Sequence, residues 1–169
     1  MWEYNGQKRP AFASKPGPGC ESVWDYPRPP VLQPTDRRVR VSFDGREIAR
    51  TASVFRILET ASPPSYYLPE SSVDWSRLVR CPGSSFCEWK GEARYWALAS
   101  NPAEAVAWSY GNPRGTFAAV RDAVSFYPGR VDCFVDDERV RAQPGHFYGG
   151  WITDEIVGPV KGEPGTGHW

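Results

Sequence analysis

Proline and glycine interrupt this sequence too often for long helices. The 169 residues include 17 Pro and 16 Gly. Proline lacks a backbone donor and glycine is conformationally free, so both end regular structure or mark turns. Trp, Tyr and Phe, at eight each, are frequent between these breaks and favour strands. The pattern predicts a mainly β fold: a small mixed β-sheet in a single domain, with one or two short helices.

Length and charge narrow the class of protein. A chain of this size can bury a core as one domain without disulfides or metal. Its 20 basic and 20 acidic residues cancel, which gives DNA or RNA binding no electrostatic support. No apolar run reaches the roughly 20 residues that a bilayer requires, and the N-terminus lacks the apolar run of a signal peptide. We expect a cytoplasmic protein without a membrane or nucleic-acid partner; the sequence leaves a homodimer open.

The cysteines indicate free thiols. Cys20, Cys81, Cys87 and Cys133 form no Cys-x-x-Cys pair, and thiols stay reduced in the cytosol. Cys81 and Cys87 are close enough for a disulfide or half a metal site, but their spacing differs from the usual zinc-ligand spacing. We therefore expect no structural zinc and no cofactor.

Composition divides the chain into three parts. Residues 1–37 are rich in proline and glycine, yet they include Trp2, Trp24 and Tyr26. A flexible linker would be poor in aromatic residues, so we expect an irregular, extended arm packed on the domain. Residues 38–148 form the β-rich core domain, and residues 149–169 form a glycine-rich C-terminal tail.

Alternating patterns predict the strands of the core. Residues 38–43 alternate strictly before Asp44-Gly45, a pair typical of tight hairpins. In the strand predicted over residues 54–59, Val54, Arg56 and Leu58 share one face, and Phe55, Ile57 and Glu59 share the other. Further strands are predicted at 85–90 and 92–98, hinged at Gly91, at 106–110, and at 131–135 before a turn at Asp136-Asp137.

Helices and one further turn are predicted from spacing. Phe117, Val120 and Val124 recur at helical spacing after Thr116, which suits a cap, so we expect a helix over 117–124. A second short helix is predicted over 69–78, with proline in its first turn. Residues 81–83, Cys-Pro-Gly, predict a turn of the chain.

The segment Cys87-Glu88-Trp89-Lys90-Gly91 is the densest in reactive side chains. As a strand it directs Cys87 and Trp89 to one side, and Glu88 and Lys90 to the other. A thiol near an ammonium group can have a lowered pKa and become nucleophilic. The alternative is a core cysteine beside a solvated Glu88–Lys90 pair.

Arg56 and Glu59 offer a second candidate group. Arg56 is a cation for an anionic ligand, and Glu59 is a carboxylate for proton transfer or for orienting Arg56. A structural ion pair is the alternative.

The remaining titratable groups give weaker signals. His146 and His168 lie in the glycine-rich C-terminal region and form no convincing Cys-His pair. Asp132, Asp136 and Asp137 are candidates for a cation, but carboxylates beside a turn are more often solubilising. We therefore expect no metal site.

Five segments carry a family resemblance when they are taken together in order. They are residues 21–30, residues 56–60 with 63–64 and 66–69, residues 87–91 with 95–96, residues 107–110, and residues 126–128. In this combination the sequence resembles the bacterial and fungal domain of unknown function family 427, over roughly residues 38–141. The resemblance implies a β-tent-like fold, similar to methionine sulfoxide reductase type B and the Rab-accessory zinc proteins, although their Cys-x-x-Cys knuckles are missing here.

The same family is also labelled nucleotidyltransferase-like. Such enzymes use Gly-Ser followed closely by paired aspartates that hold magnesium. In this chain Gly83-Ser84 is followed by no such pair, because Asp132 and Asp136 come far downstream. The label therefore has little support in these residues.

If the shared segments mark a shared pocket, six positions match it. We expect a pocket for a small polar or anionic metabolite whose identity the sequence does not give. Arg56 and Lys90 would bind its anionic group, and Trp108 and Tyr110 would form a wall. Glu59, Cys87 and Lys90 are the catalytic candidates if the protein is an enzyme. The alternatives are a non-catalytic protein-interaction module and a nucleotidyltransferase-like enzyme.

Overall fold

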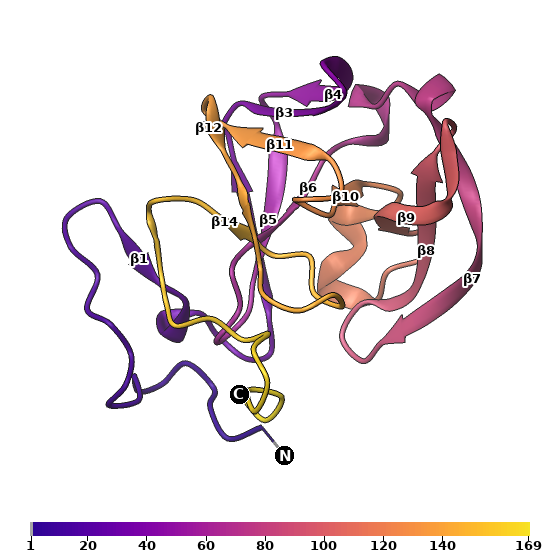
Figure 1. The fold of residues 1–169 in the computed structure, drawn as a ribbon. Helices are drawn as coiled ribbons and strands as arrows, with labels where there is room; N and C mark the ends of the chain where they lie inside the picture. The colour runs from indigo at the N-terminus through magenta and orange to yellow at the C-terminus, as the bar shows by residue number, and fades with distance from the viewer. Residues whose placement is uncertain (1) are drawn as a thin grey trace.

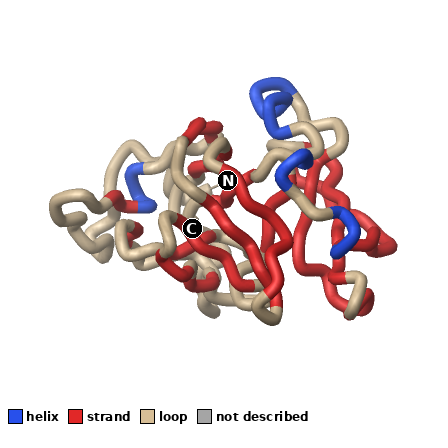
Figure 2. Tube along the Cα trace, turned by 90° about the horizontal axis from the view of Figure 1, so that it is seen from above, coloured by secondary structure: helices blue, strands red, loops and turns tan. Residues whose placement is uncertain are grey.

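The structure is a computed structural model that describes residues 2–169. About 44% of the residues lie in strands and 9% in helical turns, so the predicted mainly β fold is confirmed. Figure 1 shows the strands wrapped into several small sheets, and Figure 2 shows helical segments only as short turns at the edge of the strands. None of the helical turns within residues 2–169 has the length and hydropathy to span a bilayer.

Three antiparallel sheets form the body of the molecule. The first has the order β10-β9-β8-β7, with strands Val124–Phe126, Asn101–Tyr110, Gly91–Leu98 and Leu78–Cys87. The second has the order β12-β11-β3-β4, with strands Glu138–Arg139, Asp132–Val135, Val39–Phe43 and Arg46–Thr51. The third has the order β2-β5-β6, with strands Val31–Thr35, Val54–Leu58 and Ser65–Tyr67.

Two small strand pairs involve the terminal segments. β1 (Glu21–Ser22) pairs in parallel with β15 (Ile156–Val157), and β13 (Arg141–Ala142) pairs with β14 (Trp151–Ile152). The first pair joins the N-terminal arm to the C-terminal tail. In Figure 1 the arm, in indigo, and the tail, in yellow, run together below the sheets.

Both predicted Asp-containing turns are confirmed. Asp44 and Gly45 have φ angles of 51° and 72°, and Phe43 pairs with Arg46 across them. Asp136 and Asp137 repeat this geometry with φ angles of 47° and 67°. Two successive positive φ angles match the twist of the flanking strands, which is why Asp and Gly suit these positions.

The predicted helices are shorter than expected. η4 (Gly115–Val120) is a 3-10 helix, and Val124 already belongs to β10, where it exchanges two 2.8 Å backbone hydrogen bonds with Leu68. The helix predicted over 69–78 divides into η2 (Glu70–Ser72) and η3 (Trp75–Arg77). Between them Val73 bridges to Ala49 of β4. Pairing with neighbouring strands thus outcompetes the local helical pattern. The remaining 3-10 turn is η1 (Val23–Asp25).

Two further expectations about the backbone are wrong. The Cys-Pro-Gly segment at 81–83 is a bulge within β7, which continues to Cys87 after a register shift between Arg80 and Ser84. The N-terminal arm is also not irregular throughout, because β2 pairs with β5 along its whole length. β2 is an edge strand, the position within a sheet where proline such as Pro34 is tolerated.

Buried apolar side chains form three clusters. The largest packs the sheets together around Tyr66, Phe126 and Trp151. A second lies between β5, β6, β8, β9 and η4, and includes Tyr67 and Trp108. The third cluster, called here the arm–tail cluster, contains Val23, Trp24, Tyr26, Leu58 and Ala61, with Tyr4 and Trp169 packed against it. These three clusters leave a cavity open beside the second one.

Candidate functional site

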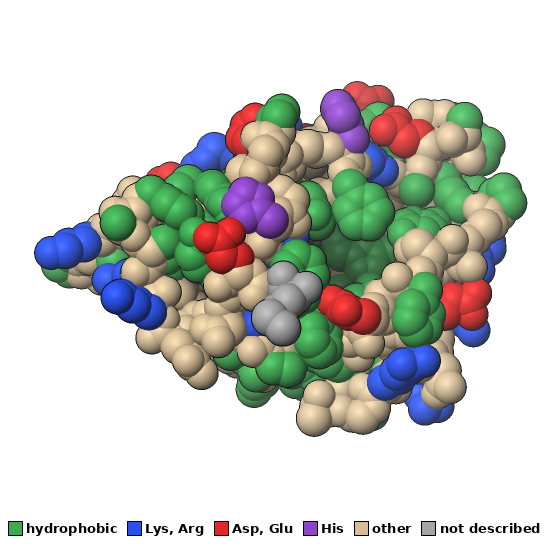
Figure 3. Space-filling view, turned by 90° about the horizontal axis from the view of Figure 1, so that it is seen from below, with side chains coloured by type: hydrophobic (Ala, Val, Ile, Leu, Met, Phe, Trp, Pro, Cys, Tyr) green, Lys and Arg blue, Asp and Glu red, His purple; other side chains and the backbone are tan. Residues whose placement is uncertain are grey.

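A cavity of about 430 Å³ lies beside the second cluster. This volume falls in the range of about 300–1,000 Å³ that is typical of small-molecule sites. Figure 3 shows a hollow among hydrophobic side chains on the face viewed from below. The lining is rich in aromatic rings: Trp2, Tyr67, Phe86, Trp89, Tyr95, Trp108, Tyr110, Tyr127, Phe147 and Tyr148.

The turn between β7 and β8 brings two of the predicted residues into this cavity. Cys87 pairs with Gly91, so Glu88, Trp89 and Lys90 form a tight hairpin loop and not a strand. The positive φ of Gly91, 103°, lets the chain reverse there. The predicted strand over 85–90 is therefore wrong in its last three residues. The prediction that Cys87 and Lys90 point to opposite sides of a strand is therefore wrong as well, and both residues line the cavity.

Lys90 is buried without a carboxylate partner. Its residue is 9% exposed, and its Nζ lies 5.8 Å from the ring centroid of Tyr110 and 5.9 Å from that of Phe117. At such distances aromatic faces attract a cation. Buried lysines are rare unless they are paired, so the ammonium group of Lys90 is a candidate for an anionic ligand.

Lys161 is a second buried amine in the same lining. Lys161 is 4% exposed, and its Nζ lies 4.2 Å from the ring centroid of Trp2. The same Nζ donates to the backbone oxygen of Trp169, the last residue of the sequence, at 3.2 Å. Burial lowers the pKa of Lys161, and the nearby Arg28 lowers it further, while Glu59 and Glu88 oppose the shift.

Sequence patterns alone did not single out Lys161. It lies in the glycine-rich tail, far from the segments with recognisable alternation. One signal was available: the chain has only four lysines against 16 arginines, and the other two, Lys8 and Lys15, are exposed. All carboxylate ion pairs within residues 2–169 use arginine or His168, and none uses a lysine.

Glu59 lines the cavity but is already bound to an arginine. Arg28 Nε lies 3.3 Å from Glu59 Oε1, and the Arg28 side chain is only 4% exposed. Arg28 also donates to the backbone oxygens of Tyr4 and Thr60, both at 2.9 Å. Glu59 is thus fixed in position at the arm side of the cavity.

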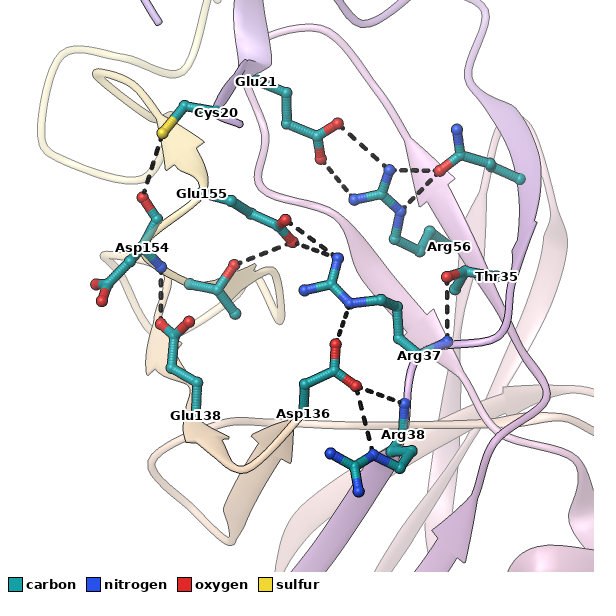
Figure 4. Close-up of polar contacts among 12 residues, drawn as sticks. Cys20, Glu21, Thr35, Arg37, Arg38, Arg56, Asp136, Glu138, Asp154 and Glu155 are labelled. Carbon is teal, nitrogen blue, oxygen red and sulfur yellow. Dashed lines mark hydrogen bonds and ion pairs between the residues drawn. The ribbon is translucent and has the colours of Figure 1, made fainter. Parts of the chain in front are cut away.

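Arg56 lies away from the cavity. It is absent from the cavity lining, whereas its neighbour Ile57 in β5 and Glu59, just after the strand, belong to that lining. Its guanidinium group bonds to Glu21 at 2.5 Å and also to Gln33 (Figure 4). The structure therefore brings together Glu59, Cys87, Lys90, Trp108 and Tyr110, and it places Arg56 in an ion pair between β5 and β1.

Tyrosine hydroxyls supply neutral hydrogen-bonding groups to the cavity. Trp108 Nε1 donates to the hydroxyl of Tyr67 at 3.0 Å, and Ser85 and Tyr95 share a hydrogen bond of 2.5 Å. Burial raises the pKa of Tyr67, and burial followed by the proximity of Tyr67 and Cys87 raises the pKa of Tyr110. Both hydroxyls stay protonated near neutral pH and can donate to a ligand.

The carboxylates near the β11 turn are engaged by arginines. Asp132 pairs with Arg139, and Asp136 pairs with Arg37 and Arg38. Within residues 2–169, no three His, Cys, Asp or Glu side chains gather closely enough to hold a metal ion.

Comparison with known families gives one result. The model of the family described as a domain of unknown function (DUF427), labelled NTP_transf_9, matches residues 31–137, which is more than half of the chain. The chain belongs to this family. No curated protein matches the chain at a significant level.

The DUF427 match contains only part of the cavity. It begins with β2, earlier than the resemblance indicated, and ends in the turn after β11. Glu59, Cys87, Lys90, Trp108 and Tyr110 lie within the match. Trp2 of the arm, Lys161 of the tail, and Phe147 and Tyr148 just before the tail lie outside it. In this chain the arm and tail complete a cavity that the DUF427 region begins.

Proposed function

We propose that the cavity binds a small metabolite with an anionic group on an aromatic or otherwise apolar body. The observation that carries this proposal is the pair of buried lysines, Lys90 and Lys161, which line one cavity and form no ion pair with an Asp or Glu side chain. A buried ammonium group is costly unless an opposite charge compensates it. An anionic ligand would supply that charge to both amines.

The walls favour an apolar ligand body. Trp108 and Tyr127 pack with ring centroids 4.6 Å apart, and Trp108 and Tyr67 with centroids 6.2 Å apart, so these rings present fixed faces to the cavity. Aromatic surfaces bury large areas of a ligand, and a few polar groups then set its orientation. The hydroxyls of Tyr67 and Tyr110 are suited to that second task.

Lys161, and not Arg56, would then bind the anionic group of the ligand together with Lys90. Arg56 is satisfied by Glu21 and Gln33 outside the lining. Glu59 and Cys87 remain candidates for proton transfer and nucleophilic attack, should the bound metabolite react there. The rival functions gain less support. An interaction module is disfavoured because the arm's aromatic rings are packed against the chain's own tail. A nucleotidyltransferase-like site is disfavoured because Glu59, a half-buried carboxylate of the lining, is bound to Arg28.

A ligand screen with matched variants tests the proposal. Small carboxylates and phosphates, each paired with its neutral amide or ester, are screened for thermal stabilisation of the full chain, and hits are measured by calorimetry. We expect anionic members to bind and their neutral partners to fail. Lys90→Met and Lys161→Met should each weaken binding about tenfold or more, since a charged hydrogen bond contributes about 1.5–3 kcal/mol.

The exposed lysines provide the control. Lys8→Met and Lys15→Met remove the same charge outside the cavity and should leave the affinity unchanged. Arg56→Ala should lower stability but not ligand affinity in the remaining folded protein. Equal loss of binding in all four lysine variants, or equal binding of anions and neutral partners, would contradict the proposal.

A further inference from the structure

Lysine, and not arginine, is the cation of this cavity, although arginine is the general choice elsewhere in the chain. The ion pairs within residues 2–169 are built from arginines, apart from one with His168, while two of only four lysines are buried in one lining. Arginine holds carboxylates better by its planar, bidentate geometry, but it does not lose its proton. Lysine can become a neutral amine and form a bond to carbon. The choice of lysine therefore indicates amine chemistry beyond charge.

The two amines have different surroundings. The Nζ atom of Lys90 lies 5.8 Å and 5.9 Å from the ring centroids of Tyr110 and Phe117, whose faces attract an ammonium group. Lys161 and Arg28 both lie against the ring of Trp2, with Lys161 Nζ 4.2 Å and Arg28 Cζ 4.4 Å from its centroid. The side-chain carboxylates that act on Lys161 are those of Glu59 and Glu88. Its Nζ also donates to the backbone oxygen of Trp169, the last residue of the sequence, at 3.2 Å. Burial and Arg28 lower the pKa of Lys161, which increases its share of neutral amine.

We propose that Lys161 forms an imine with a carbonyl group of the ligand while Lys90 holds the ligand's anionic group. The ligand class is then a small keto acid or aldehyde acid with an apolar body. This inference rests on the proposed function, because it uses the same cavity and deepens its substrate class.

The step balances without a co-reactant. The lone pair of neutral Lys161 Nζ forms a bond to the carbonyl carbon, and the C=O π electrons move to the oxygen. The two protons of the amine pass to that oxygen, which leaves as water, and a C=N bond remains. Glu59, which lines the same cavity and is fixed by Arg28, is the carboxylate placed to relay a proton between nitrogen and oxygen.

Reductive trapping tests the imine directly. The full chain is incubated near neutral pH with low concentrations of glyoxylate, pyruvate or phenylpyruvate and with cyanoborohydride, which reduces an imine to a stable secondary amine. Intact mass and peptide mapping then locate the adduct. We expect one adduct per chain, on Lys161, at least tenfold more abundant than on Lys8 or Lys15, which serve as internal references. Labelling of all four lysines in proportion to exposure would overturn the inference.

Variants separate this inference from the proposed function. Lys161→Arg keeps the charge but cannot form the imine, so it should abolish the adduct while anion binding persists. Lys90→Met should lower adduct formation by glyoxylate several-fold, but not by the uncharged propionaldehyde. If anions bind to the cavity and no adduct forms on Lys161 of the unmodified chain, the imine is wrong and the proposed function stands. If Lys161 is trapped and Lys90→Met has no effect with any carbonyl acid, the role of Lys90 in both proposals is wrong.

Discussion

The two lysines of the cavity lie in walls that are assembled in different ways. Lys90 belongs to the hairpin wall, residues 87–91, which a single tight turn between β7 and β8 creates. Lys161 belongs to the arm–tail wall, formed by Trp2, Tyr148 and Lys161, whose members are far apart in sequence. The hairpin wall needs only its own turn and the neighbouring strand. The arm–tail wall exists only because the arm and the tail pack together, so perturbations should separate the two.

The largest expected effect comes from the core of the arm–tail cluster. Trp24 is fully buried, donates from Nε1 to the backbone oxygen of Pro159 at 2.9 Å, and packs edge-on against Phe12 and Trp169. Trp24→Ala should lower the free energy of unfolding by about 3–5 kcal/mol, because it leaves a large cavity. Denaturant unfolding measures this loss.

The same variant should damage the two walls unequally. If it remains folded, proteolysis is expected to cut the arm and tail before the hairpin. Trp75→Ala is the control. Because Trp75 is 36% exposed, this substitution should lower the free energy of unfolding clearly less than Trp24→Ala does. A loss for Trp24→Ala no greater than that for Trp75→Ala would show that the arm–tail wall is not held by this cluster.

The next effect in size concerns the hairpin wall. Gly91 has a φ of 103°, and a Cβ built there meets no atom closer than 3.6 Å, so the cost of Gly91→Ala is backbone strain and not a clash. We expect a loss of about 1–3 kcal/mol in the free energy of unfolding. Gly167→Ala, at a glycine with open space and no positive φ, should be nearly neutral. If both variants are neutral, the hairpin turn does not depend on Gly91.

The contrast between the walls also explains what the sequence could predict. The Asp44-Gly45 and Asp136-Asp137 turns depend on local φ preferences, so the pattern located both. The region around Cys87 and Lys90 could also be located from the sequence, because the resemblance to DUF427 rests on short contiguous segments and one of them contains both residues. Within that segment, polar and apolar residues alternate in Glu88-Trp89-Lys90 as they would in a strand. In the sequence, Gly91 was the one residue of this segment that indicated a reversal of the chain.

Long-range contacts account for what could not be predicted. Lys161 and Trp2 line the cavity because the arm packs against the tail. Neither segment has a periodic sequence pattern from which this packing could be predicted. Arg56 is satisfied by Glu21 of the arm, 35 positions earlier in the chain, so its residue type suggested a ligand where the fold supplies a partner. The helix predicted over 117–124 ends at Val120, because Val124 pairs with Leu68 as part of β10.

A smaller effect should appear in the reactivity of the thiols. Cys87 and Cys20 are both half-buried, but only Cys87 lies in the cavity with the two lysines. The positive charge should attract anionic iodoacetate relative to neutral iodoacetamide. The ratio of the two alkylation rates is therefore expected to be roughly 2–10-fold higher at Cys87 than at Cys20. Mass spectrometry of labelled peptides at low ionic strength measures both rates in one sample.

The lysine variants sharpen this comparison of the walls. Lys90→Met should lower the rate ratio at Cys87 more than Lys161→Met does, because Lys90 shares the hairpin with Cys87. Cys133 is fully buried, and burial raises the pKa of its thiol well above the usual value, so it should react most slowly with either reagent. Equal ratios at Cys87 and Cys20 would mean that the amines exert no field on the cavity.

The smallest expected effect is a change in how stability depends on pH. Burial, and next the proximity of Arg28, lowers the pKa of Lys161 in the fold below its usual 10.5. Between the folded and the unfolded pKa the unfolded chain binds more protons, so the contribution of Lys161 to the free energy of unfolding increases with pH. Below the folded pKa the cost of burying its charge is fully present. Lys161→Met should therefore gain stability relative to the natural chain at about pH 7, and this gain should shrink toward pH 10.5.

Urea unfolding of both proteins between about pH 7 and pH 10.5 measures the difference in stability, in which the titration of buried tyrosines cancels. Lys8→Met is the control from the exposed arm. A difference that is constant or grows with pH would mean that Lys161 keeps its proton in the fold, and the arm–tail wall would then offer a second ammonium group like that of the hairpin wall and no free amine.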